Sequence, residues 1–186
     1  MPATGLQKSM SKMANKLSHA AACSLLAGLL FLFAGCGYRF AGSGNLPGGV
    51  RSVAVQVPVN STAETGLENM VTRALVDELA RRKHRIVPAD RADAVLSGKI
   101  ENLWLETVTH KEGSVSQERR VKVAVFLTLR SQAGDKLWSS GTLTADWTFD
   151  VVNGNKAATD ANRRKALEEV VRKLAETAYA RMTGQF

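Results

Sequence analysis

The sequence predicts an α+β fold, a two-layer sandwich in which two amphipathic helices cover one face of a four-stranded, mostly antiparallel sheet. In four segments, apolar residues alternate with a period of two, which is typical of half-buried strands. In two longer segments, apolar residues recur with the helical period. The predicted order is β-α-β-β-β-α, and both helices can bury their apolar stripes on the single apolar face of such a sheet.

The first predicted strand, residues 53–59, carries valines at alternate positions: Val53, Val55, Val57 and Val59. Pro58 cannot donate a hydrogen bond to a neighbouring strand. We therefore expect this strand to lie at a sheet edge or to end at the proline. Asn60-Ser61-Thr62 follows, and these residue types favour a turn and a helix cap.

The first predicted helix spans Glu64–Arg82. Its apolar face is formed by Leu67, Met70, Val71, Ala74, Leu75 and Leu79, and its polar face by Glu68, Arg73, Asp77, Glu78 and Arg81. The basic end, Arg81-Arg82-Lys83, suits the negative pole of the helix dipole. Each fully buried Leu, Met or Val contributes roughly 1.5–3 kcal/mol before conformational entropy is subtracted.

The second predicted strand spans Ala94–Thr109 and follows a connector, Arg85–Asp93, that contains Pro88. Leu96, Gly98 and Ile100 alternate along it, whereas Leu103 and Leu105 take the opposite parity. A strand can change parity by inserting one extra residue, so the pattern predicts a bulge near Glu101–Asn102.

Two hairpin turns, His110–Ser114 and Gln132–Asp135, separate the remaining strands. The third strand, Arg120–Arg130, has Val121, Val123, Val125, Leu127 and Leu129 on one side. The fourth, Leu137–Val151, has Leu143, Ala145, Trp147 and Phe149 on one side. Its other side, like that of the third strand, is mainly polar, which leaves an outer sheet face for water or a polar partner.

The last predicted helix spans Asp160–Met182, with an apolar stripe of Leu167, Val170, Val171, Leu174, Ala178 and Met182. If the first two strands are parallel, three loops share one end of the sheet: Asn60–Glu64, His110–Val115 and Val152–Thr159. The opposite end then holds the Arg81–Arg85 segment and the approach from the N-terminus.

The N-terminal segment has the three parts of a secretory signal: Lys8, Lys12 and Lys16 without acidic residues, the 15-residue apolar run Ala20–Ala34, and a small-residue cleavage site. Leu32-Phe33-Ala34-Gly35-Cys36 has the pattern of a bacterial lipoprotein signal. Cleavage before Cys36 would make its thiol the point of lipid attachment. A transmembrane anchor or a buried helix is the alternative, but a spanning helix needs roughly 20 apolar residues. Met10 or Met13 could be the true start.

These features divide the chain into a signal peptide (1–35), a flexible lipid-anchored tether rich in glycine (36–49) and a single α+β domain (50–186). The two cysteines, Cys23 and Cys36, lie outside the domain, so no disulfide is available to it. The formal charge of +8 falls to +5 without the three signal lysines. This excess suits an anionic partner, and export argues against nucleic acid.

The sequence contains no motif that indicates catalysis, a metal or another cofactor. The three histidines have no partners at metal-ligand spacing, and HExxH, an acidic calcium loop and a Gly-x-Ser-x-Gly elbow are absent. We therefore do not expect an enzyme. A lipid-anchored hydrolase whose site is assembled only in space stays open as an alternative.

Four features together resemble the LptE family of lipopolysaccharide-assembly lipoproteins. They are Gly35-Cys36-Gly37-Tyr38-Arg39-Phe40, the first strand running through Pro58-Val59-Asn60-Ser61 into Gly66-Leu67-Glu68, Ala92–Ile100 at the start of the second strand, and the β-α-β-β-β-α order. The resemblance covers about Cys36–Arg181. It implies a non-enzymatic lipoprotein of the outer membrane that faces the periplasm and the lumen of a large β-barrel, LptD. There it would plug and support the barrel and assist lipopolysaccharide delivery to the outer leaflet.

The resemblance also implies residues that contact lipopolysaccharide. Lys111, in Lys-Glu-Gly, and Lys156, before the last helix, match basic loop residues linked to this contact in the family. A lysine ammonium can bind phosphate as a point charge. Arg119, Arg120 and Lys122 form a further basic candidate patch. Ordinary solvated loop lysines are the alternative interpretation, and an adaptor or activator lipoprotein of another envelope assembly system is the alternative function.

Overall fold

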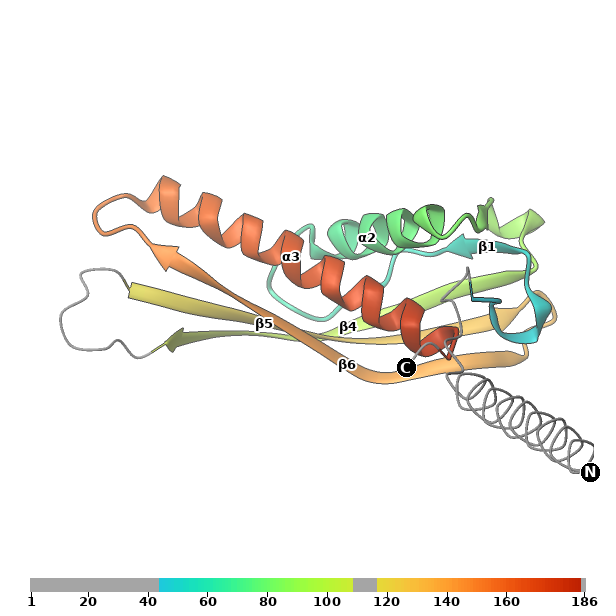
Figure 1. The fold of residues 1–186 in the computed structure, drawn as a ribbon. Coiled ribbons are helices and arrows are strands. Elements are labelled where there is room, and N and C mark those ends of the chain that lie inside the picture. Colours follow the sequence, from blue (N-terminus) through green and yellow to red (C-terminus); the bar gives the residue numbers. More distant parts are fainter. Residues whose placement is uncertain (1–43, 109–116, 185–186) are drawn as a thin grey trace, which may run out of the picture. The chain divides into compact units, whose positions relative to one another are not determined.

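The computed structural model describes residues 44–108 and 117–184, and Figure 1 shows their fold. The elements are β1 (Ser52–Val55), β2 (Val59–Asn60), α2 (Leu67–Arg81), β3 (Arg85–Ile86), β4 (Ala94–Val108), β5 (Gln117–Ser131), β6 (Lys136–Val151) and α3 (Lys156–Met182), with short 3-10 turns at Pro47–Gly49 and Ala89–Arg91. Both helices lie on the same face of the sheet (Figure 1). The predicted α+β class with two helices covering one face is therefore confirmed.

The sheet has six strands within the described residues, not the four that we predicted. Its order is β3-β1-β4-β5-β6, and β2 pairs with β4 beyond the end of β1. The β1–β3, β1–β4 and β2–β4 pairs are parallel, whereas the much longer β4–β5 and β5–β6 ladders are antiparallel. The additional strands arise because the first predicted strand is divided in two and the predicted connector contains β3.

Pro58 divides the first predicted strand. The backbone N–H groups of Gln56 and Ser61, on either side of it, donate to the carbonyls of Leu96 and Ile100 in β4. The proline between them has no N–H to donate, so the ladder is interrupted there. β1 is not an edge strand, because β3 covers its other side. Val59 pairs with Lys99 of β4 and is exposed. The predicted alternation of buried valines therefore does not extend to Val59.

The two helices bury their predicted stripes against the sheet. Leu67, Val71, Leu75 and Leu79 of α2 are at most 4% exposed, and every residue of the predicted α3 stripe is buried. α2 is shorter than predicted, while α3 begins four residues earlier, at Lys156. Glu78, which we predicted on the polar face of the first helix, is instead buried, with 1% exposure.

The predicted bulge in the long hairpin is confirmed, since the β4–β5 register shifts between Ile100 and Asn102. A second irregularity, which the sequence pattern did not indicate, lies in β6 before Thr142. There Gly141 has φ +63°, a conformation that suits glycine. The buried Ser140 hydroxyl accepts the Leu127 backbone N–H at 2.9 Å, which keeps that donor satisfied where the regular ladder is broken.

β4 and β5 extend well past the N-terminal end of α2 (Figure 1). Asn60, the last residue of β2, pairs with Ile100, and β4 continues from there to Val108. Eight further residues of strand measure about 27 Å. The predicted loop His110–Val115 lies outside the described residues. Of the other two, Asn60–Glu64 begins well short of the end of β4, whereas Val152–Thr159 follows the end of β6, so these two loops do not meet at one end as we predicted.

The described residues contain one self-contained core. All of its buried hydrophobic residues lie between Leu46 and Met182, within the compact unit formed by residues 43–186. Leu46 is only 2% exposed, so residues 44–49, which we predicted as part of the tether, pack against the domain instead. Neither helix in the described part is long and apolar enough to cross a membrane.

Candidate functional site

Two of the predicted site residues, Cys36 and Lys111, lie outside the described residues. Lys156 is described, but it is the first residue of α3 and not part of the preceding loop. The Asn155 side chain caps this helix by accepting the Ala158 backbone N–H at 3.0 Å. The Lys156 side chain is 87% exposed, and its ammonium pairs with Asp160 one turn later at 2.5 Å.

The three basic residues of β5 do not form one surface. Arg120 and Lys122 pair with Thr148 and Asp146 of β6 on the sheet face away from the helices, whereas Arg119 pairs with Phe149 on the helix side. The Arg120 guanidinium lies 3.5 Å from the Asp146 carboxylate. The Lys122 ammonium lies 5.5 Å from the centre of the Trp104 ring.

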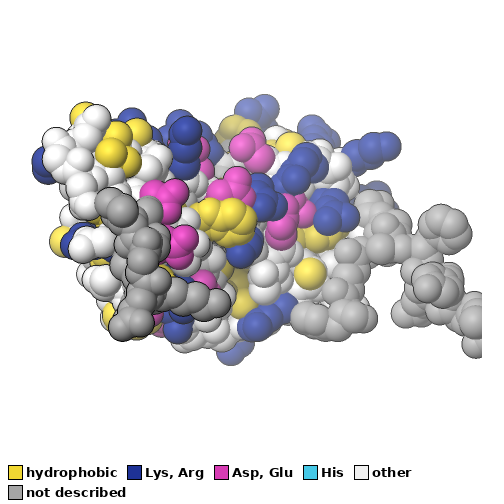
Figure 2. Space-filling model, turned by 60° about the vertical axis from the view of Figure 1, so that its left-hand side comes forward, with side chains coloured by type: hydrophobic (Ala, Val, Ile, Leu, Met, Phe, Trp, Pro, Cys, Tyr) yellow, Lys and Arg dark blue, Asp and Glu magenta, His cyan; other side chains and the backbone are white. Residues whose placement is uncertain are grey.

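Lys156 and the three β5 residues nevertheless lie at the same end of the sheet, because Gln117 at the start of β5 pairs with Val151 at the end of β6. We call this the distal end and define it as residues 103–108, 117–123 and 145–162. It carries four basic and five acidic residues, so it has no excess of positive charge. Figure 2, in which this side of the molecule comes forward, shows the two signs interspersed.

The sheet face away from the helices, which we call the open face, is mixed in character. Thr142, Thr144, Asp146 and Thr148 of β6 are exposed on it, as the alternation predicted. Trp104 and Phe126 are also exposed there, by 39% and 36%. A broad face with polar rows and isolated aromatic rings can contact another protein over a large area.

A groove of about 1240 Å³ runs between α2 and α3 on the other side of the domain. Its charged lining residues are Glu64, Arg73, Asp77, Arg81, Lys156, Asp160, Arg163, Arg164, Glu168 and Arg172. Arg163 pairs with Glu64 across the groove. Arg172 pairs with Glu169 and Glu176 along its own helix at 2.6 and 2.8 Å. These pairs engage several of the charged side chains that line the groove.

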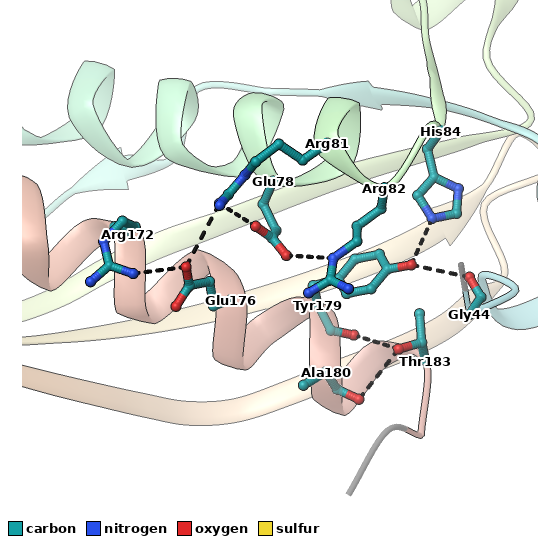
Figure 3. Close-up of polar contacts among 10 residues, drawn as sticks. All are labelled: Gly44, Glu78, Arg81, Arg82, His84, Arg172, Glu176, Tyr179, Ala180 and Thr183. Atoms are coloured by element: carbon teal, nitrogen blue, oxygen red, sulfur yellow. Dashed lines mark hydrogen bonds and ion pairs between the residues drawn. The ribbon is translucent and has the colours of Figure 1, made fainter. Parts of the chain in front are cut away.

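A polar network ties the C-terminal ends of both helices to the first described residues (Figure 3). The carboxylate of buried Glu78 pairs with Arg81 and, at 3.0 Å, with Arg82. The Arg82 guanidinium lies 5.0 Å above the ring of Tyr179. The Tyr179 hydroxyl contacts His84 Nε2 at 3.0 Å and donates to the Gly44 carbonyl at 3.3 Å. The network therefore holds the chain to the domain at Gly44.

Burial shifts the two titratable partners in this network in the expected directions. It lowers the pKa of the His84 imidazole and raises the pKa of the Tyr179 phenol, an effect that the nearby Arg82 charge partly opposes. Both groups therefore favour their neutral forms. The neutral imidazole and the neutral phenol make a hydrogen bond that stabilises the fold. The two groups are not arranged as a nucleophile and its general base.

The described residues contain no group of three His, Cys, Asp or Glu side chains that could hold a metal ion. The groove between the helices and the burial of Glu78 were both missed by our sequence analysis. The polar residues of each helix look like solvent-exposed faces in isolation, and only the packing of α2 beside α3 makes a groove of them. Arg81 and Arg82, three and four residues after Glu78, are the one local signal for a buried partner.

The comparisons with known proteins agree with the fold. The family model LptE, described as lipopolysaccharide-assembly, matches residues 50–182. This range contains all the strands and both helices of the described structure. No curated protein matches the chain.

Several solved lipoprotein structures have the same fold. A minor lipoprotein from Acinetobacter baumannii is 13% identical with a TM-score of 0.50, and covers 72% of this chain and 91% of its own. Rare lipoprotein B from Shewanella oneidensis is 15% identical with a TM-score of 0.50, over 72% and 94% of the two chains. Lipoprotein B from Nitrosomonas europaea is 12% identical with a TM-score of 0.50, over 80% and 91%. These structures share the fold, and the family match over residues 50–182 establishes that this chain belongs to the LptE family of lipopolysaccharide-assembly proteins.

Proposed function

We propose that this protein is an outer-membrane lipoprotein, anchored through Cys36, that plugs and supports an LptD-like β-barrel and assists the delivery of lipopolysaccharide to the outer leaflet. The observation that carries the proposal is the family match over residues 50–182. The protein acts by binding and not by catalysis. The anchored domain faces the periplasm and the barrel lumen.

The open face of the sheet supports this role. The lumen of a large outer-membrane barrel is polar, so a plug must present polar side chains to it. The exposed threonines of β6 do so, and Trp104 and Phe126 offer large rigid contacts among them. Of the helices in the described residues, neither α2 nor α3 covers this face.

The proposal is tested by purifying the native lipoprotein from outer membranes in mild detergent through a C-terminal tag. We expect a large β-barrel protein to copurify in a stable complex. Copurification of a peptidoglycan synthase or a secretion component in its place would indicate the adaptor role and overturn the proposal. The intact mass of the purified chain tests the anchor separately, since it should begin at Cys36 and include acyl chains.

Lys156, with Lys111, is our candidate for contact with lipopolysaccharide. An exposed ion pair between residues four apart on a helix contributes only about 0.3–0.5 kcal/mol. The pair with Asp160 therefore holds the Lys156 ammonium only weakly, and a phosphate can displace it. Its position at the start of α3 places it at the distal end, where β6 also ends.

We predict that Lys111→Glu combined with Lys156→Glu lowers the affinity for lipopolysaccharide by about tenfold or more, because two attractive contacts with phosphate become repulsive. The measurement is binding of purified lipopolysaccharide to the tagless protein. The control, Lys99→Glu with Lys165→Glu, has the same net charge and changes two exposed lysines elsewhere. Both variants should be folded as judged by circular dichroism. Equal affinities for lipopolysaccharide would then show that Lys111 and Lys156 do not contact it.

A further inference from the structure

The end of the domain opposite the distal end is strongly basic. Pairing and contacts bring its segments together: Ser52 pairs with Arg85, Arg130 pairs with both Val95 and Lys136, and Arg181 donates to the Ser140 carbonyl. We call its exposed basic residues the basic pole; they are Arg51, Lys83, Arg85, Arg91, Arg130, Lys136 and Arg181.

Few acidic residues balance this pole. Three carboxylates are exposed among the same segments: Asp90, Asp93 and Asp135. Two further arginines, Arg81 and Arg82, are already paired with buried Glu78. The exposed groups therefore leave an excess of four positive charges at one end of the domain, whereas the described residues of the distal end have no such excess.

The chain leaves the domain at this same end. The Gly44 carbonyl is bonded to Tyr179, and Tyr179 contacts His84, which directly follows Lys83. Only the eight residues from Cys36 to Ser43 separate Gly44 from the proposed lipid. Eight residues span at most about 29 Å even when fully extended. Gly44, beside the basic pole, is therefore always within about 29 Å of the bilayer that holds the lipid.

We propose that the basic pole docks on anionic phospholipid headgroups of the membrane that holds the Cys36 lipid. The inference rests on the proposed anchoring at Cys36, and it adds a second contact between the protein and the membrane. Each Lys or Arg close to an anionic surface strengthens binding about fivefold. Because the tether makes this contact intramolecular, even weak headgroup binding orients the anchored domain.

The experiment tests the basic pole in a chain that lacks Cys36 and its lipid. A chain of residues 43–186 retains every buried hydrophobic residue of the core, so it folds without the anchor. We expect it to bind vesicles of phosphatidylcholine with 30% phosphatidylglycerol, measured by flotation, and not to bind pure phosphatidylcholine. Because a 0.5 M salt solution screens charges beyond a few ångströms, it should release the bound protein.

The pole variant carries Lys83→Gln, Arg85→Gln, Arg91→Gln and Lys136→Gln, all at exposed positions. We expect it to lose at least about a hundredfold in binding to the anionic vesicles. The matched control carries Lys99→Gln, Arg73→Gln, Arg164→Gln and Lys165→Gln, which remove the same charge from other exposed positions. It should stay within about threefold of the parent.

Two results would overturn the proposal: a parent chain that does not bind the anionic vesicles, and pole and control variants that weaken equally. The vesicles contain neither barrel nor lipopolysaccharide, so a failure of copurification with a barrel would leave this result unchanged. A failure of the anchor itself would appear in the intact mass as a chain without acyl groups.

Discussion

Replacing both Arg81 and Arg82 with alanine should lower the free energy of unfolding by about 3 kcal/mol. The Glu78 side chain is only 2% exposed, and these two guanidinium groups are its ion-pair partners among the contacts described. Removing them leaves a carboxylate buried without compensation, which costs far more than losing an exposed ion pair. The measurement is urea denaturation of the chain of residues 43–186.

A third substitution distinguishes this mechanism from general damage to α2. Adding Glu78→Leu to the double variant removes the unpaired charge and fills the same space with apolar atoms. We expect the triple variant to recover to within about 1 kcal/mol of the parent, the remainder being the lost contact of Arg82 with the Tyr179 ring. A triple variant no more stable than the double variant would contradict the assigned role of Glu78.

Gly98→Ala should destabilise the domain by about 2–3 kcal/mol, although alanine is normally a conservative replacement. Gly98 lies in β4 opposite Leu127 of β5. A Cβ atom there would lie 2.5 Å from Leu127 Cδ2 and 2.6 Å from the Phe126 carbonyl oxygen. The leucine side chain can move, but the backbone carbonyl belongs to the central ladder of the sheet, so the two strands must separate.

The neighbouring position provides the control for this effect. Ser97 pairs with Thr128 on the open face, and Ser97→Ala should change the free energy of unfolding by less than about 0.5 kcal/mol. Denaturation midpoints of the two variants give the comparison. If Gly98→Ala were as stable as the parent, the close approach of β4 and β5 at this position would be wrong.

The sequence pattern predicted the long elements well because their signal is local. The α3 stripe and the parity change at Glu101–Asn102 both follow from the spacing of apolar residues, and the structure confirms both. The short strands β2 and β3 could not be found in this way. Each has two residues, too few for a periodic pattern, and each forms only because a neighbouring strand supplies its hydrogen bonds.

The candidate site was less predictable than the fold, because its arrangement depends on distant segments. The separation of Arg119 from Arg120 and Lys122 is an exception, because it follows from the alternation along β5 that the sequence already indicates. The basic pole collects residues from the turn after α2, a 3-10 turn, the strand ends and α3, so no local run reveals it. Cys36, by contrast, is identified entirely by its local context, and its lipid attachment stays a prediction.

The central claim is that the domain acts by fitting against a larger barrel, and cross-linking from the open face tests it most directly. A photoreactive amino acid at Thr144, which is exposed on β6, would be activated in living cells, and the adduct would be identified by mass spectrometry. Our account predicts an adduct with a large outer-membrane β-barrel protein. An adduct only with proteins of another envelope assembly system, or no adduct at Thr144 in a chain that reaches the outer membrane, would contradict it.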